Sequence, residues 1–301
     1  MHNRSESQPI NGVLVVDKPA GLTSHDVVTR VRRIVQQKAV GHLGTLDPMA
    51  TGVLPLVLGK MTRLAQFYLS SQKCYEGVIR FGFATDTYDA EGEVVGPAQK
   101  PSLELPAVRE LATKFQGEIE QMPPPFSAKK IQGVPAYKLA RKKKEVALKP
   151  AKVVIEEFDI TALEDSCAQF RARVASGTYM RSVAHDMGQM AGCGAHLVAL
   201  RRTAVAEFEL KDAHRLEDVE RVRENREALL ELLVHPRKLL PAMPAVTASD
   251  EIAVRIRHGR PVNLPELSRA REVKVFQGQR ELIAISTRVA GTLFHPKIVL
   301  G

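Results

Sequence analysis

The sequence predicts an α+β protein with a second, smaller β-rich module at its C-terminal end. Apolar β-branched runs and amphipathic helical stretches follow one another irregularly along the 301 residues. They lack the strict strand–helix–strand order that builds a parallel α/β sheet. Prolines at positions 236, 241 and 244 then mark a linker, and short strand-like runs follow it. We therefore expect a large α+β core and a small module after the linker.

The first half of the core is expected to start with a buried strand at residues 12–17, an apolar β-branched run that the turn-forming residues 18–21 end. Ser24 is the expected N-cap of a helix. The apolar face of this helix comprises Val27, Val28, Val31, Ile34 and Val35. Residues 41–52 are glycine-rich and show no period. Further strands are expected at 53–58 and 73–81, and helices at 62–69 and 105–115.

The second half of the core continues with strands expected at 153–160, 167–175 and 196–210. Between the last two lies a helix at 179–191, with Met180, Val183, Met187 and Met190 on its buried face. After the linker we expect one helix at 251–258 and strands at 273–276, 282–286 and 292–299.

Composition favours a polyanionic partner. Lys and Arg number 43 against 34 Asp and Glu, which gives a net charge of +9 and an isoelectric point near 9.5. Charge alone leaves open whether the partner is RNA, DNA or neither. The three cysteines are too few and too scattered along the chain for a disulfide framework or a zinc site, and they contain no C-x-x-C pair. No apolar run reaches the roughly 18–20 residues of a membrane span, and residues 1–9 lack a signal-peptide core. We expect a cytoplasmic protein with no membrane association.

The glycine-rich stretch at residues 41–48, GHLGTLDP, carries the most informative carboxylate. Pro48 restricts the backbone of Asp47, so the side chain is aimed by a stiff loop. Spacing alone also allows a turn residue that is hydrogen-bonded to local amides. A phosphate-binding loop is excluded, because position 54 is leucine where that motif needs glycine and Met61 replaces its Ser or Thr.

Several blocks together resemble one family. The stretch GHLGTLDPMATGVLPLVLG resembles the catalytic motif of the TruB family, the bacterial tRNA pseudouridine-55 synthases. Further blocks are similar to the family in order and spacing across roughly residues 10–210: DKPAGLTSHDVV, KCY, SGTYMR, GAH and LRR. The resemblance implies a pseudouridine synthase core with a mixed, largely antiparallel sheet flanked by helices and loops. Residues 246–301 resemble a PUA-type RNA-binding domain.

The domain boundaries implied by the resemblance are a flexible N-terminus at 1–9, a catalytic domain at 10–235 and the PUA-like domain at 246–301. Within the catalytic domain, residues 123–152 match the family's thumb, a basic insertion that closes over RNA. Lys129 and Lys130 belong to it and are expected to bind substrate phosphates. Without the resemblance, the basic stretch from Lys129 to Lys152 would be interpreted as a solvated loop.

The same resemblance assigns catalytic roles. Asp47 would act on the uridine as a nucleophile at the base or the sugar, or by stabilising positive charge at C1′. Arg181 would pair with Asp47, which favours the ionised carboxylate and holds its orientation. Tyr75 would stack on the target base and could relay the proton lost from C5. Without the motif, Arg181 is a surface arginine and Tyr75 fills a strand face.

Three more residues match the family's substrate-binding positions. His42 would enter the T-loop of the tRNA and take the space of the extruded nucleotides, whereas Tyr179 and Leu200 would line the uridine pocket. Read alone, His42 is a loop histidine and Leu200 a core leucine. Lys18 and Pro19 are expected to brace the site without reacting.

The expected activity is isomerisation of uridine 55 in the T-loop, with the T-arm stem-loop of tRNA as partner. The resemblance implies a monomer that needs no metal, no cofactor and no obligate protein partner. Two alternatives stay open. One is a guide-RNA-dependent pseudouridine synthase, and the other is a non-catalytic tRNA chaperone.

Overall fold

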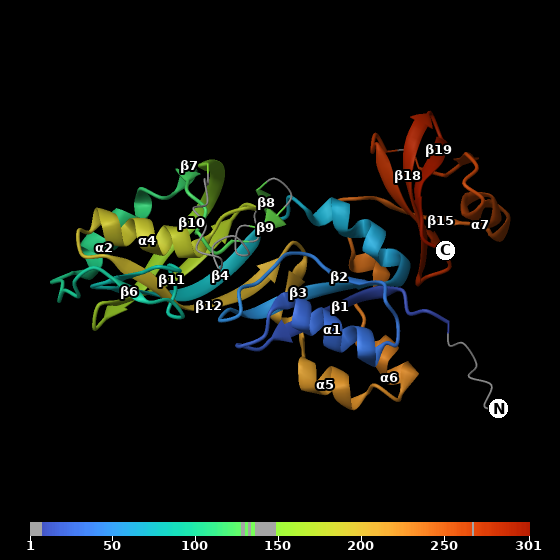
Figure 1. The fold of residues 1–301 in the computed structure, drawn as a ribbon. Coiled ribbons are helices and arrows are strands. Elements are labelled where there is room, and N and C mark those ends of the chain that lie inside the picture. Colours follow the sequence, from blue (N-terminus) through green and yellow to red (C-terminus); the bar gives the residue numbers. More distant parts are fainter. Residues whose placement is uncertain (1–7, 128–129, 132–133, 136–148, 267) are drawn as a thin grey trace.

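The computed structural model describes residues 8–127, 130–131, 134–135, 149–266 and 268–301. Residues 1–7 of the expected flexible N-terminus and most of the expected thumb lie outside this range. The chain forms a large mixed sheet with helices against it, and a smaller five-stranded sheet near the C-terminus (Figure 1). The α+β prediction is therefore confirmed.

The large sheet contains ten strands, and eight of them follow one another in the order β14-β1-β3-β12-β4-β11-β10-β7. Strand β2 pairs with β3, and β13 pairs with β12. The pairs β1–β14 and β3–β12 are parallel, and the other pairs described for this sheet are antiparallel. The bounds are β1 Gly12–Lys18, β2 Val40–His42, β3 Thr51–Leu58, β4 Lys73–Phe81, β7 Gly117–Gln121, β10 Ala151–Glu164, β11 Cys167–Val174, β12 Ala195–Val205, β13 Phe208–Glu209 and β14 His214–Arg215.

The helices of the core share one continuous apolar cluster with one face of the large sheet. Helices α2 and α4 pack on β10 and β12, and α1 and α5 pack near β1 and β2 (Figure 1). Their bounds are α1 Ser24–Ile34, α2 Leu105–Thr113, α4 Met180–Met190, α5 Leu216–Arg221 and α6 Arg226–Glu231. The shorter elements are the 3₁₀ helices Gly59–Tyr68, Leu210–Asp212 and Pro236–Lys238 and the strands β5 Ala84–Thr85, β6 Val94–Val95, β8 Lys130–Ile131 and β9 Val134–Pro135.

Strands β1 and β3 are buried on both faces, which explains their uninterrupted apolar runs. Leu14 and Val16 of β1 face the helices, and Val13 and Val15 enter a second cluster on the opposite face. Strand β11 instead alternates buried and exposed residues, because its second face is open to solvent. The β1–β3 region is thus the most deeply buried part of the sheet.

The C-terminal module packs directly onto the core. Its sheet, in the order β15-β17-β18-β19-β16, shares an inner cluster with helix α7. Phe276, Leu282 and Ile285 belong instead to the second cluster of the core, with Met61 and Leu64 of the long 3₁₀ helix. The bounds are β15 Ala245–Ala248, α7 Asp250–Arg257, β16 Val262–Asn263, β17 Glu272–Gln277, β18 Glu281–Ala290 and β19 Leu293–Val299.

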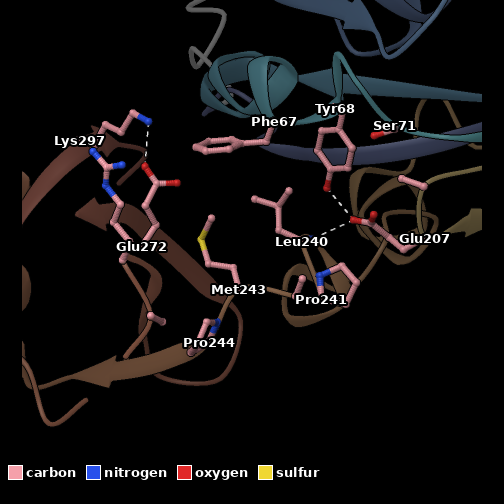
Figure 2. Close-up of a pocket in the computed structure, with 14 residues that line it drawn as sticks. Phe67, Tyr68, Ser71, Glu207, Leu240, Pro241, Met243, Pro244, Glu272 and Lys297 are labelled. Atoms are coloured by element: carbon pink, nitrogen blue, oxygen red, sulfur yellow. Dashed lines mark hydrogen bonds and ion pairs between the residues drawn. The ribbon is translucent and has the colours of Figure 1, made fainter. Parts of the chain in front are cut away.

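A cavity of about 740 Å³ lies where the module meets the core (Figure 2). On the core side, Glu207 accepts hydrogen bonds from the Tyr68 hydroxyl at 2.6 Å and from the Leu240 amide at 2.8 Å. On the module side, Lys297 pairs with Glu272 at 2.8 Å. The Glu207–Leu240 contact ties the linker to the core, whereas the Glu272–Lys297 pair lies within the module, and neither contact involves Asp47 or Arg181.

Some expected elements differ from the observed ones. The N-cap of α1 is Thr23, which forms a capping box with Asp26, and not Ser24. The helix expected at 62–69 is a 3₁₀ helix. The strand expected at 196–210 ends at Val205, because the chain turns at Ala206 (φ 50°) into β13. Helices α5 and α6 and strand β15 were not predicted. Within the described part of the chain, no helix is both long and apolar enough to cross a membrane.

Candidate active site

The loop between β2 and β3 holds Asp47 in an irregular backbone that receives hydrogen bonds from outside the sheet ladder. Each of the five consecutive carbonyls from position 44 to position 48 accepts a hydrogen bond. The Asp47 carbonyl accepts from the Ala50 amide at 3.1 Å, and the Pro48 carbonyl accepts from the Gly21 amide at 2.9 Å. Because a buried carbonyl without a partner is costly, these donors fix the path of the loop.

Lys18, the last residue of β1, anchors the loop directly after Asp47. Its fully buried ammonium donates to the carbonyls of Pro19 at 2.9 Å, Leu22 at 2.6 Å and Pro48 at 3.1 Å. All three donors are therefore used. Burial lowers the pKa of Lys18 to about 8, and the negative charge of Asp47 partly opposes this shift. The structure thus gives Lys18 the bracing position that the sequence predicted.

Arg202 anchors the loop before Asp47. Its guanidinium is fully buried and donates to the carbonyls of Val53 at 2.8 Å, Gly44 at 3.0 Å and Thr45 at 3.2 Å. Strand β12 can come this close because residue 52 is glycine: a Cβ there would lie 2.2 Å from the Arg202 carbonyl oxygen, and its φ is +102°.

Ser24 holds the residue next to Asp47. Its buried hydroxyl accepts from the Leu46 amide at 2.8 Å and donates to the Leu46 carbonyl at 3.2 Å. Because Thr23 caps the helix, the side chain of Ser24 is free for this contact. Ser24, which the sequence predicted as the N-cap of the helix, therefore anchors the loop instead.

Arg181, on the first turn of α4, forms a two-point ion pair with Asp47. Nε donates to Oδ2 and Nη2 to Oδ1, both at 2.9 Å. The arginine side chain is only 4% exposed, whereas that of Asp47 is 32% exposed. The carboxylate therefore has a buried cation behind it and an open side toward solvent. Paired, parallel hydrogen bonds of this kind also fix its orientation.

The remaining donors of Arg181 are also engaged. Nη1 donates to the Thr87 carbonyl at 3.1 Å, and Nη2 donates to the Phe126 carbonyl at 2.9 Å. A second carboxylate, that of buried Asp89, lies 3.5 Å from Nη1. Arg181 is thus a buried, fully partnered residue and not the surface arginine that the sequence also allowed.

The segment that presents Thr87 and Asp89 to Arg181 is itself rigidly held. The Asp89 carboxylate accepts from the Thr87 hydroxyl at 2.6 Å and from the Glu91 amide at 3.1 Å. Tyr88 has a left-handed backbone (φ 66°), and its ring stacks on His185 of α4 with centroids 3.8 Å apart. Strained backbone of this type persists only where its surroundings hold it in place.

Tyr179 sits at the N-terminus of α4, directly before Met180 and Arg181. The side chain of buried Gln121 brackets its backbone, accepting from the Tyr179 amide at 2.8 Å and donating to the Tyr179 carbonyl at 3.1 Å. Burial raises the pKa of the Tyr179 phenol, and the charge of Asp47 adds to the shift. The structure therefore brings Asp47, Tyr179 and Arg181 together.

Tyr75 of β4 and Leu200 of β12 lie on neighbouring strands, and their side chains are on the same face of the sheet. Both are 8% exposed and belong to the apolar cluster under the helices. Tyr75 also interacts with Arg202, where it opposes the lowering of the arginine pKa that burial causes. Tyr75 is thus linked to the Asp47 loop through Arg202. The burial of Leu200 fits both a pocket wall and a core position.

His42 ends β2, close to the start of the loop. Its Nδ1 accepts from the Gly44 amide at 3.3 Å. Burial lowers the pKa of His42, and the positive charge of Arg202 adds to this shift. The neutral imidazole is the form that can accept this hydrogen bond.

Two expected phosphate contacts are not described in full. Lys129 lies outside the described residues, and of Lys130 only the backbone, in β8, is described. The part of the chain with described side chains contains no group of three or more His, Cys, Asp or Glu side chains placed to hold a metal ion.

Comparison with known proteins decides the family. Residues 32–180 match the model of the TruB family pseudouridylate synthase N-terminal domain, and residues 181–240 match that of the tRNA pseudouridylate synthase B C-terminal domain. The tRNA pseudouridine synthase B of Solibacter usitatus is 48% identical over 295 residues, which cover 97% of this chain and all of that protein. The chain belongs to the TruB family.

Other relatives agree with this membership. The tRNA pseudouridine synthase B of Opitutus terrae is 47% identical over 211 residues, or 70% of this TruB-family chain and 88% of that protein. A chain in a solved H/ACA RNP bound to a substrate RNA containing 2′-deoxyuridine has a TM-score of 0.71 at 23% identity and covers 96% of this chain and 85% of its own. A chain of a Cbf5–Nop10–Gar1 complex has a TM-score of 0.70 at 24% identity and also covers 96% of this chain and 85% of its own. These two likenesses establish a shared fold.

Three of the residues that hold this TruB-family site, Arg202, Asp89 and Gln121, were assigned no role in the sequence analysis. Arg202 could have been found from the sequence, because an arginine within an apolar strand-like run is expected to be buried and to need buried acceptors. Asp89 and Gln121 carried no local signal. Their partners, Arg181 and Tyr179, are far away along the chain and become neighbours only in the folded protein.

We expect Ser24→Ala to slow turnover about tenfold or more and to cost about 1–3 kcal/mol of stability, because both polar backbone groups of Leu46 lose their partner. Thr23→Ala is the matched control. It removes a helix cap worth about 1 kcal/mol but leaves turnover within about twofold. Unfolding curves and single-turnover rates of both variants measure the difference. Equal loss of turnover in the two variants would contradict the anchoring role of Ser24.

We expect the stabilising effect of His42 to be lost in acid. Because its pKa is lowered in the folded state, the unfolded chain takes up the proton first as the pH falls through about 6.5. The free energy of unfolding of the native protein should therefore approach that of His42→Gln between about pH 7.5 and pH 5. Urea titrations of both proteins across this pH range test the prediction. A difference in the free energy of unfolding that does not change with pH would show that the burial of His42 has no such effect.

Proposed function

We propose that this chain converts a uridine of tRNA to pseudouridine, and that the target is uridine 55 of the T-loop with Asp47 as the catalytic carboxylate. The observation that carries the proposal is the two-point ion pair between buried Arg181 and solvent-open Asp47. Its relatives named tRNA pseudouridine synthase B support the tRNA substrate.

The reaction moves one bond and one proton. The N1–C1′ glycosidic bond breaks, the uracil turns, and C5 forms the new bond to C1′; C5 then loses its proton while N1 gains one. A carboxylate can assist by bonding transiently to the sugar or the base, or by stabilising positive charge at C1′. Asp47 suits each of these roles, because its orientation is fixed by Arg181 and its open side faces solvent.

Arg181 is proposed as the residue that positions Asp47 during the reaction. Its five N–H groups point to Asp47, Asp89 and two carbonyls, so the guanidinium cannot rotate away without leaving buried acceptors unpaired. A preorganised cation of this kind stabilises negative charge without reorganisation at the moment of reaction.

The remaining site residues are proposed to handle the extruded nucleotide. Tyr75 stacks on the uracil, Tyr179 and Leu200 line its pocket, and His42 fills the space that it leaves in the T-loop. Their positions around the loop from β2 to β3 and the start of α4 support this division of roles. Extrusion costs a few kcal/mol of stacking, which contacts of this kind offset.

The proposed enzyme works alone as a monomer, without a cofactor. The match to the Solibacter usitatus protein, which runs over 97% of this chain, favours this reading over a guide-RNA-dependent one. Likeness to chains of H/ACA and Cbf5 complexes supports the fold only. A non-catalytic chaperone would not need an ion-paired carboxylate that faces phosphate-rich RNA. Residues 10–235 are proposed as the catalytic domain, with the thumb at 123–152, and residues 246–301 as the PUA-like RNA-binding domain.

Asp47→Asn should abolish turnover, because the neutral amide neither acts as a nucleophile nor stabilises a cation, while tRNA affinity stays within about tenfold. Tritium release from C5-labelled tRNA and filter binding measure the two effects. Asp159→Asn, on the exposed side of β10, is the control and should retain full activity. Turnover above a small fraction of the native rate in Asp47→Asn would exclude Asp47 as the catalytic carboxylate.

Purified protein alone should convert one uridine of an isolated T-arm stem-loop, because the chain itself carries the complete carboxylate–arginine site. Changing the stem sequence with pairing preserved should matter little, whereas unfolding the loop should abolish turnover, since RNA is read mainly by shape and at splayed bases. Tritium release from the stem-loop is the measurement. Absence of release until a guide RNA or a second protein is added would support the guide-dependent alternative.

A further inference from the structure

Lys73 is a half-buried cation at the edge of the candidate active site. It is the first residue of β4 and lies two positions before Tyr75, so both side chains are on the same face of the sheet. Its Cε lies 3.6 Å from the position that a Cβ on Gly44 would occupy, and Nη1 of Arg202 lies 3.5 Å from that same position. Two positively charged side chains therefore flank the start of the Asp47 loop.

The ammonium of Lys73 has unused hydrogen-bonding capacity. It donates to the Ser71 carbonyl at 2.7 Å, and within the described part of the chain no carboxylate forms an ion pair with it. A lysine ammonium has three N–H donors, so two remain available to a ligand. Lys18 differs in this respect, because each of its three donors is held by a carbonyl of the protein.

This arrangement is unfavourable without a ligand. Burial, and to a smaller extent the charge of Arg202, lower the pKa of Lys73 to about 8. A partly desolvated ammonium beside a second cation is stabilised by an approaching anion, and the anions that accompany the proposed substrate are its backbone phosphates. A bracing lysine would have its donors occupied, as Lys18 has.

We propose that Lys73 binds a backbone phosphate of the substrate RNA beside Gly44, at the edge of the catalytic pocket. The inference rests on the proposed function, since the ligand is the RNA strand next to the extruded uridine. The contact lies between the loop that begins at His42 and the ring of Tyr75. It therefore holds the strand at the point where the base leaves the stack, and it serves binding more than the chemical step.

The test combines protein variants with RNA in which single phosphates are neutralised. Lys73→Met and Lys73→Arg are compared with Lys114→Met, an exposed lysine at the end of α2. Each protein is titrated with T-arm stem-loops that carry one methylphosphonate at successive positions. At one of these RNA positions, the methylphosphonate should weaken binding to the native protein about tenfold, as expected for the loss of a charge-assisted contact.

Lys73→Met should bind unmodified RNA about tenfold more weakly and should be insensitive to that one methylphosphonate. Its log–log dependence of affinity on salt should be flatter by about 0.7–0.9. Lys73→Arg should keep most of the affinity and the sensitivity, and Lys114→Met should resemble the native protein. The rate of the chemical step at saturating RNA should stay within about threefold.

Two outcomes would overturn the proposal. In the first, Lys73→Met responds to every methylphosphonate as the native protein does. In the second, its binding is unchanged while the chemical step is slow, which would make Lys73 a brace of the Gly44 loop. Thermal unfolding of each variant identifies any loss of folding. If Lys73→Met does not fold, the binding of Lys73→Arg to the methylphosphonate series tests the proposal instead. Failure of the native protein to release tritium from the unmodified stem-loop would refute the proposed substrate, a separate result from either of these.

Discussion

The candidate active site depends on the donors that bind the five consecutive carbonyls from position 44 to position 48. The loop leaves the sheet after β2 and rejoins it at β3, so it cannot use strand pairing in between. Two fully buried cations, Arg202 before Asp47 and Lys18 after it, take the two ends, and Ser24 takes the middle. Burying both cations is costly, but each donates to carbonyls of the loop, so the loop is ordered on both sides of Asp47. Electrostatic catalysis requires this order before the substrate arrives.

The rigid loop is then matched by a rigid partner. Arg181 projects from the first turn of α4 and is surrounded by acceptors from three separate segments: the Asp47 loop, the segment at 86–89 and the chain near Phe126. Because one guanidinium serves all three, their relative positions are coupled, and a shift of one segment disturbs the others. Asp89 adds a second carboxylate to the same cation, which keeps the buried guanidinium partnered on the side away from Asp47.

The sequence correctly predicted those features that a local residue pattern determines. The bounds of β4 and the body of α4 follow from alternation and helical spacing, and resemblance identified Asp47 and Arg181 as a pair, which the structure joins. It failed where a residue 20 or more positions away decides the outcome. Ser24 has the chemistry of an N-cap, yet it serves Leu46, 22 positions on, because Thr23 already caps the helix. Gln121 and Asp89 are equally ordinary until the fold places Tyr179 and Arg181 beside them.

The double-sided burial of β1 and β3 connects the C-terminal module to the Asp47 loop. Lys18 ends β1 and pairs across to Gly52 of β3, so this anchor lies beside the strand that the Asp47 loop enters. Helix α1 packs on one face of the strands, and the cluster that includes Phe276 and Leu282 of the module packs on the other. The module therefore packs against β1, which carries the anchor Lys18, and against β3, which the Asp47 loop enters, whereas the other anchor, Arg202, lies on β12. A fold in which only one face was covered would leave Val13, Val15 and Val53 exposed and the base of the loop less constrained.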